Sequence, residues 1–79
     1  MAAKSKNIVG DRVKEARLKH APPLTQDELS GRLSALGVAI DRAGVSKIEV
    51  GLRRVLDFEV KALAKVLGVS VDWLLATRK

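Results

Sequence analysis

Basic side chains gather in the segment DRAGVSKIEVGLRR, which covers residues 41–54. Its four cationic residues are Arg42, Lys47, Arg53 and Arg54. Val45 and Ile48 are three residues apart, so on a helix they share one apolar face, and the first two cations point elsewhere. The last two follow the helix stop expected at Gly51. Long cationic donors on and just beyond a short helix suit a polyanion, because they can hydrogen-bond base edges and neutralise phosphates.

The residue types needed for catalysis are not grouped in this sequence. There is no cysteine, and there is a single histidine, His20. The sequence contains no Ser/His/Asp grouping, no metal-ligand cluster with workable spacing and no glycine-rich phosphate loop. We therefore expect no enzymatic activity, no cofactor and no metal.

Composition limits the kind of protein this can be. A chain of 79 residues has room for one core, and 47% hydrophobic residues are enough to fill it. Aromatic residues are scarce, so the core must consist of Leu, Val, Ile and Ala, as in a helical bundle. The net charge of +6 and the pI of about 10.2 favour DNA, RNA or an acidic membrane surface as the partner. A merely soluble, lysine-decorated surface would give the same totals, so the location of the charge has to decide.

The sequence carries no sign of a membrane or export route. No apolar run reaches the length of a membrane span, and the start, MAAKSKNIVG, lacks the apolar core of a signal peptide. The absence of cysteine rules out a disulfide scaffold and favours a reducing compartment. We expect a cytoplasmic protein without membrane association.

Hydrophobic spacing and helix-end signals predict an all-α fold of five helices, near residues 7–20, 25–36, 41–50, 57–67 and 70–76. Residues 1–6 are expected to form a flexible basic tail ahead of one domain over residues 7–79. Two prolines end the first helix, because proline cannot continue it. Thr25 and Glu28 have the spacing of a capping box at the start of the second helix, and Gly37 supplies its left-handed stop.

Further signals mark the other three helices. Asp41, Asp57 and Ser70 are expected to be their N-caps, and Gly68 closes the fourth helix. The apolar residues 38–40 (VAI) could form a short strand or a connector. Because no second strand candidate lies nearby, we predict a loop tucked against the core.

Two short segments, at the start of the second predicted helix and at the end of the third, have the residue pattern of a known protein family. LTQDEL, residues 24–29, opens one predicted helix, and VSKIEVG, residues 45–51, closes the next. VGDRV, residues 9–13, precedes them, and LGVS, residues 67–70, follows with a final leucine pair. In this order the segments resemble the Cro and phage-repressor-type helix-turn-helix family over nearly the whole chain. The resemblance implies a five-helix bundle of the lambda-repressor-like type that binds double-stranded DNA.

The resemblance also implies roles for individual residues. The positions that read bases are occupied by Arg42, Ala43, Ser46 and Lys47. The positions that contact the phosphate backbone are occupied by Gln26, Arg53 and Arg54. Glu49 would repel phosphate, and the family pattern pairs it with the arginine of the first helix, here Arg12, as a structural ion pair. Trp73 is expected in the core rather than at an interface.

The chain departs from the family pattern between the second and third helices. Between the Thr25–Gln26 start and Val45 the chain is about five residues longer than the usual family spacing, and the extra segment SALGVAI, residues 34–40, lengthens both the second helix and the connector after it. Gly44, inside the third helix, costs about 1 kcal/mol of helix stability relative to alanine. Both features bear on the angle of the third helix and therefore on the assignment of base contacts.

We expect a sequence-specific DNA-binding transcriptional regulator of the phage-like repressor type, which reads the major groove with helix 41–50. Such proteins usually act as homodimers on DNA, and the last helix offers Trp73, Leu74 and Leu75 as apolar surface for a partner. The alternative is a protein-interaction module, such as an antitoxin or a partner-binding helical bundle. The basic residues around the third helix favour DNA binding but are compatible with both roles.

Overall fold

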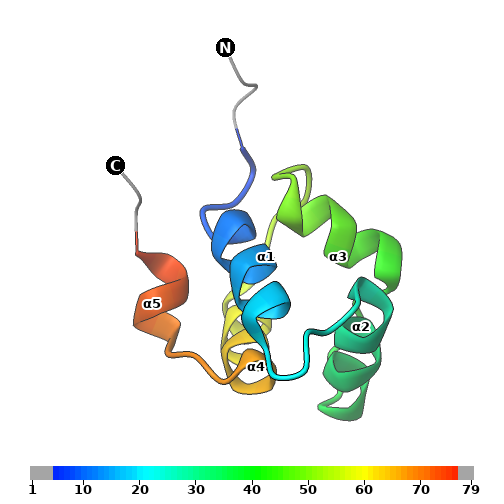
Figure 1. Cartoon of the computed structure of the whole chain (residues 1–79). Helices are drawn as coiled ribbons and strands as arrows, with labels where there is room; N and C mark the ends of the chain where they lie inside the picture. The colour runs from blue at the N-terminus through cyan, green and yellow to red at the C-terminus, as the bar shows by residue number, and fades with distance from the viewer. Residues whose placement is uncertain (1–4, 77–79) are drawn as a thin grey trace.

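Five α-helices make up the part of the chain that the structure describes. The computed structural model describes residues 5–76, and its helices are α1 (Gly10–Lys19), α2 (Gln26–Ala35), α3 (Arg42–Glu49), α4 (Asp57–Leu67) and α5 (Val71–Leu75) (Figure 1). No strand occurs among the described residues, so the predicted all-α fold of five helices is confirmed. Residues 1–4 of the predicted tail and residues 77–79 of the predicted domain lie outside the described part of the chain.

Side chains cap three helices where the sequence predicted caps. Thr25 Oγ1 accepts a hydrogen bond from the Glu28 amide at 3.0 Å, and Glu28 Oε1 accepts one from the Thr25 amide at 2.8 Å. This is a complete capping box at the start of α2. Asp41 and Ser70 accept hydrogen bonds from amides three residues further on, at 2.7 and 3.0 Å, and so begin α3 and α5.

The start of α4 differs from the prediction. Asp57 is the first residue of the helix, and the N-cap is Leu56. The carboxylate of Glu59 reaches back and accepts a hydrogen bond from the Leu56 amide at 2.9 Å. The predicted Asp57 cap is therefore wrong by one residue: the helix begins at Asp57, and Glu59, at the N3 position, satisfies the backbone amide of the N-cap residue Leu56.

The connector between α2 and α3 packs against the core. Gly37, with a φ of +81°, takes the left-handed conformation that ends α2, as predicted. Val38 and Ile40 then turn inward and are only 8% and 3% exposed. The prediction of a tucked loop is confirmed.

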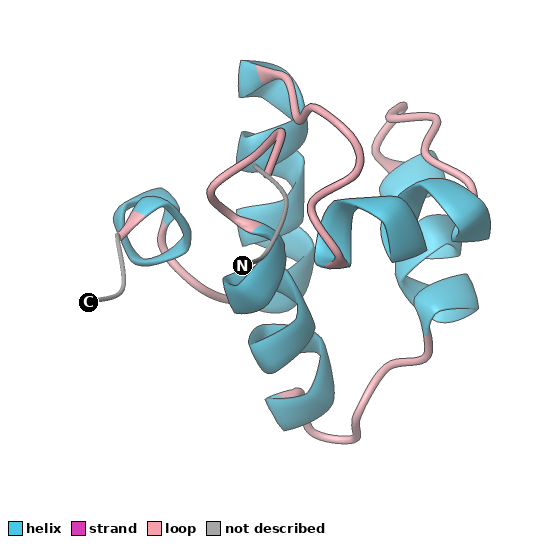
Figure 2. Ribbon diagram, turned by 90° about the horizontal axis from the view of Figure 1, so that it is seen from above, coloured by secondary structure: helices cyan, strands magenta, loops and turns pink. Residues whose placement is uncertain are grey.

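The helices surround an aliphatic core. α1 and α4 lie in the middle of the molecule, with α5 on one side and the α2–α3 pair on the other (Figures 1 and 2). The fully buried side chains are Val9, Val13, Leu29, Leu33, Val45, Ile48, Leu63 and Leu74. Every helix contributes at least one of them. α3 is therefore held by its apolar side, and its other side remains outside the core.

The junction of α1 and α5 contains the tryptophan. Trp73 is partly buried against the core, as expected, and the guanidinium carbon of Arg12 lies 4.5 Å from the centre of its ring. This is cation–π geometry.

Among residues 5–76, no helix is long and apolar enough to cross a membrane.

Candidate nucleic-acid interface

The two sides of α3 have opposite character. Val45 and Ile48 are fully buried, and Gly44 and Glu49 are buried with them. The candidates for base reading, Arg42, Ala43, Ser46 and Lys47, lie together on the other side: Ser46 is half-buried and the other three are exposed. The structure therefore brings these four predicted residues onto one accessible surface of one helix. A helix with such a surface has the dimensions to enter a major groove.

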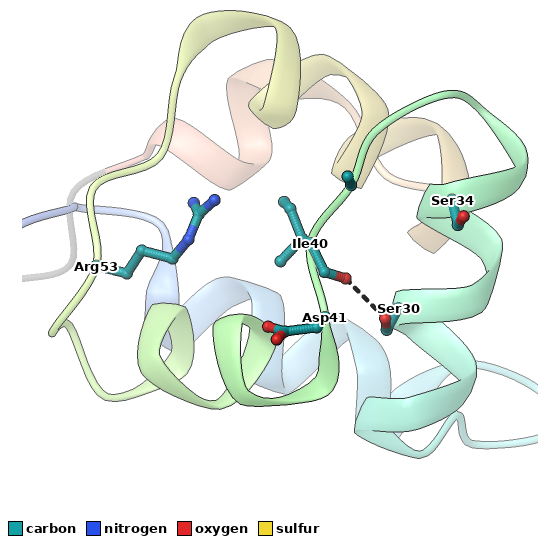
Figure 3. A pocket seen from close by; sticks show the side chains of 6 residues that line it. Ser30, Ser34, Ile40, Asp41 and Arg53 are labelled. Carbon is teal, nitrogen blue, oxygen red and sulfur yellow. Dashed lines mark hydrogen bonds between the residues drawn. The ribbon is translucent and has the colours of Figure 1, made fainter.

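Local hydrogen bonds fix where α3 starts despite the long connector. Asp41 Oδ1 accepts from the Gly44 amide, which caps the helix. Ser30 Oγ, on α2, donates to the carbonyl oxygen of Ile40 at 2.7 Å and so ties the end of the connector to the preceding helix (Figure 3). The extra residues are therefore accommodated by a folded loop, and α2 and α3 still pack directly against each other.

The packing around the first turn of α3 explains why residue 44 is a glycine. A Cβ atom at this position would lie 2.9 Å from Ile40 Cγ2 and 3.0 Å from Asp41 Oδ1. These distances are shorter than ordinary van der Waals contacts, so any larger residue would displace the capping carboxylate or the buried Ile40. Glycine lowers the stability of the helix relative to alanine, but only glycine fits into the tight first turn of α3.

The predicted partner of Glu49 is wrong. Arg17, and not Arg12, donates from Nε to Glu49 Oε2 at 2.7 Å and from Nη2 to Glu49 Oε1 at 2.9 Å. The two side chains are only 10% and 3% exposed. Arg17 Nη1 also donates to the carbonyl oxygen of Leu24 at 2.9 Å, and its hydrogen bond to Glu49 raises the pKa of the guanidinium. The acid on α3 is neutralised from α1, as expected, but by a different arginine.

Helical geometry explains this error. Arg12 and Arg17 are five residues apart on α1, which is a rotation of about 140° around the helix axis. Only one of them can face α3. Arg17 does so, and Arg12 is turned toward Trp73 on α5. Val13 and Ala16 mark the buried side of α1, but the two arginines lie equally far around the helix from the middle of that side, so the helical phase alone does not choose between them.

Gln26, a predicted phosphate contact, is the first residue of α2. Its amide nitrogen Nε2 donates to Glu49 Oε1 at 3.1 Å, and the side chain is half-buried. It borders a hollow that Arg17, Thr25, Asp27 and Arg42 also line. The start of α2 and Arg42, in the first turn of α3, therefore line the same hollow.

The two arginines that follow α3 have different surroundings. Arg54 is exposed, and within residues 5–76 its side chain makes no hydrogen bond or ion pair. Arg53 is half-buried and forms an ion pair with Glu59 of α4, with Nη1–Oε1 and Nη2–Oε2 distances of 3.0 and 3.1 Å. This pairing raises the pKa of Arg53 and lowers the pKa of Glu59.

Sequence reasoning missed Asn7, which connects the start of the chain to the end of α3. Its Nδ2 donates to the carbonyl oxygens of Ile48 and Arg53 at 3.1 and 2.8 Å. Its Oδ1 accepts from the amides of Val9 and Gly10 at 3.1 and 2.8 Å. An asparagine at the start of a predicted helix, here the one expected near residues 7–20, is a capping signal. The contacts with the distant α3 segment have no such local signal.

Five helices, with α2 and α3 packed against each other and one side of α3 left exposed, form a helix-turn-helix domain of the lambda-repressor-like type in residues 5–76. A family model described as helix-turn-helix matches residues 13–74, and the chain belongs to this family, the Cro/CI-type helix-turn-helix proteins. It is a family of DNA-binding domains that are typically non-enzymatic, so membership implies DNA as the partner. No curated protein is similar enough to the sequence to count as a match.

Proposed function

We propose that this protein is a sequence-specific transcriptional regulator, acting as a repressor, that reads the major groove with α3. One observation carries the proposal: Arg42, Ala43, Ser46 and Lys47 share the outer side of a helix whose inner side is fixed in the core. A reading helix must be held rigidly while its side chains stay accessible, and α3 meets both conditions.

Each of these four residues has a suitable chemistry for base edges. Arg42, in the first turn, has two parallel donors that match guanine O6 and N7, and Lys47 is a second long donor. Ala43 is suited to a thymine methyl group, and the Ser46 hydroxyl can donate or accept at a base edge. A mixture of charged, polar and apolar readers supports sequence preference rather than charge attraction alone.

Backbone contacts would come from both ends of the unit. Arg54 extends from the loop after α3, where its exposed guanidinium can neutralise a phosphate. Gln26 stands at the N-terminus of α2, where free amides and the helix dipole favour an anion. Arg53 was expected to act in the same way as Arg54, but its guanidinium is paired with Glu59.

We further propose that the protein binds DNA as a homodimer. Of the residues expected to face the partner, Leu74 is fully buried and Trp73 partly buried, whereas Leu75 is 40% exposed. Leu75 lines a hollow together with the exposed side chains of Ile8 and Leu56. A two-fold dimer formed through this surface would require half-sites about 34 Å apart. A footprint that covers one non-palindromic half-site would contradict it.

The experiment begins with random duplex DNA at low salt, which the protein should retard because of its charge. Selection from a random DNA pool should then enrich one sequence. The variants Arg42→Ala and Lys47→Ala should lower affinity for the selected duplex more than for random DNA. Lys65→Ala, which removes one exposed positive charge from the last turn of α4, is the matched control. If no sequence is enriched although random DNA is bound, sequence-specific regulation is wrong.

A further inference from the structure

A second arginine–glutamate pair lies under the first turn of α3. The guanidinium of Arg53 contacts both carboxylate oxygens of Glu59, and Nη1 also donates to the carbonyl oxygen of Arg54 at 2.8 Å. The side chain of Glu59 is 6% exposed and that of Arg53 is 30% exposed. Both terminal nitrogens of Arg53 are therefore engaged within the protein.

The stem of Arg53 passes close to the start of α3. A Cβ atom placed on Gly44 would lie 3.7 Å from Arg53 Nε, which is van der Waals contact. Arg53 and Asp41 line one hollow, with Ile40 and Ser30 on its other walls, and the Arg53 side chain points into it (Figure 3). Arg53, in the loop between α3 and α4, thus lies between Glu59 of α4 and the turn that carries Arg42 and Ala43.

Charge is consistent with this placement. The carboxylate of Asp41 acts on Arg53 in the same direction as Glu59, so acids on both α3 and α4 stabilise the cation. Asp41 is the N-cap of α3. A cation held between a helix cap and a neighbouring helix links the positions of the two elements.

We propose that Arg53 is a positioning residue for the recognition helix, fixed by Glu59, and contributes to sequence preference rather than to phosphate neutralisation. This inference rests on the proposed reading of DNA by α3. The long connector leaves the start of α3 attached to α2 through a loop, and Arg53 supplies support from the opposite side. Arg54, its exposed neighbour, carries the phosphate contact.

Two substitutions with opposite charge effects test the inference. Arg53→Ala removes a positive charge and Glu59→Gln removes a negative one. A positioning role requires both variants to lower the ratio of affinities for selected and random duplex, by about 2- to 30-fold. A phosphate contact would instead make Arg53→Ala weaken both duplexes, and Glu59→Gln would leave binding unchanged or tighten it.

Arg53→Lys is the sharpest variant, because it keeps the charge and loses the two-pronged geometry. We expect it to lower the affinity ratio and to leave the salt dependence of binding unchanged. Arg54→Ala is the matched control and should flatten the salt dependence on both duplexes with the ratio preserved. A wild-type ratio in Arg53→Lys, with a flatter salt slope in Arg53→Ala, would overturn the inference. Circular dichroism confirms that each variant is folded at the temperature used.

A measurement without DNA separates this inference from the proposed function. In the free protein, the amide resonances of Arg42 and Gly44 should shift in Arg53→Lys and in Glu59→Gln, but not in Arg54→Ala. Unchanged resonances would overturn the positioning role whatever the protein binds. Shifted resonances in a protein that prefers no DNA sequence would mean that the proposed function fails while Arg53 still positions α3.

Discussion

Arg17 donates hydrogen bonds to both carboxylate oxygens of Glu49 and thereby joins α1 to the last residue of α3. Gln26 donates to the same carboxylate from the start of α2, so one acid connects three helices. Glu49 is the only acid on α3, and these contacts neutralise its charge, so that it does not repel a phosphate. It also fixes the C-terminal end of the helix whose outer side carries Arg42, Ala43, Ser46 and Lys47.

We expect Arg17→Ala to lower the free energy of unfolding by about 3–5 kcal/mol, because it leaves Glu49 buried without its cation. Arg12→Ala is the control on the same helix. It removes a cation–π contact with Trp73 and should cost about 0.5–2 kcal/mol. Urea unfolding of the two variants gives both values. Equal losses, or a larger loss for Arg12→Ala, would show that the Arg17–Glu49 pair does not stabilise the fold as described.

At Gly10, the backbone of α1 comes close to the backbone of α3. A Cβ atom there would overlap the backbone carbonyl oxygen of Ile48, and a backbone atom cannot swing aside as a side-chain end can. We therefore expect Gly10→Ala to destabilise the protein, although alanine favours the helix by about 1 kcal/mol. Gly31→Ala on α2 is the control, since its Cβ would meet no atom within 4 Å and should stabilise. Thermal unfolding that gives both changes the same sign would contradict this account of α1–α3 packing.

Acid should weaken the Arg53–Glu59 pair over a defined pH range. The hydrogen bonds from Arg53, and then the one from the Leu56 amide, lower the pKa of Glu59. A lowered pKa in the folded state means that this stabilisation is complete above the ordinary glutamate pKa, about 4.3, and is lost as the pH falls through the lower folded value. The free energy of unfolding should therefore decrease below about pH 4.3.

Glu59→Gln should be less stable at pH 7 and should lose less stability on acidification than the wild type. Glu28→Gln is a matched control, because the pKa of Glu28 is also lowered, by its hydrogen bonds with Thr25. Glu28 is exposed, so solvent screens its charge and its removal should change the acid response less. Parallel pH profiles for wild type and Glu59→Gln would exclude Glu59 as a source of the acid sensitivity.

The helices could be predicted because their signals are local. Thr25 with Glu28, Asp41, Ser70 and Gly37 all act within a few residues, and each has the expected conformation or hydrogen bond. The buried sides of the helices follow from spacing alone. The fold and the exposed face of α3 were therefore within reach of the sequence.

The ion-pair partners could not be predicted from the sequence, because they depend on contacts between distant segments. α1 carries two arginines, Arg12 and Arg17, that could pair with Glu49. The rotation of α1 about its own axis places Arg17 next to Glu49. Arg53 and Arg54 are adjacent and identical in type, yet only Arg53 faces α4. Such choices are made by the packing angle of whole helices, which no local pattern contains.

The final prediction separates base reading from phosphate binding on the proposed interface. Arg42 lies in the first turn of α3, so Arg42→Ala should relax sequence preference and cost about 1–3 kcal/mol on the selected duplex. Arg54 lies in the loop beyond the helix, so Arg54→Ala should weaken all duplexes alike and reduce the salt slope by about one per half-site. Salt titrations of each variant on selected and random duplexes give both quantities.

Bases and phosphates are reached from different places on the DNA. A base edge is reached only from inside the groove, and the exposed side of α3 is the surface that would lie there. A phosphate is met at the groove's rim, where a loop arginine can follow it on any sequence. If Arg42→Ala weakens both duplexes equally, Arg42 contacts the backbone. The recognition helix would then be rotated from the proposed orientation, toward a geometry that the long connector permits.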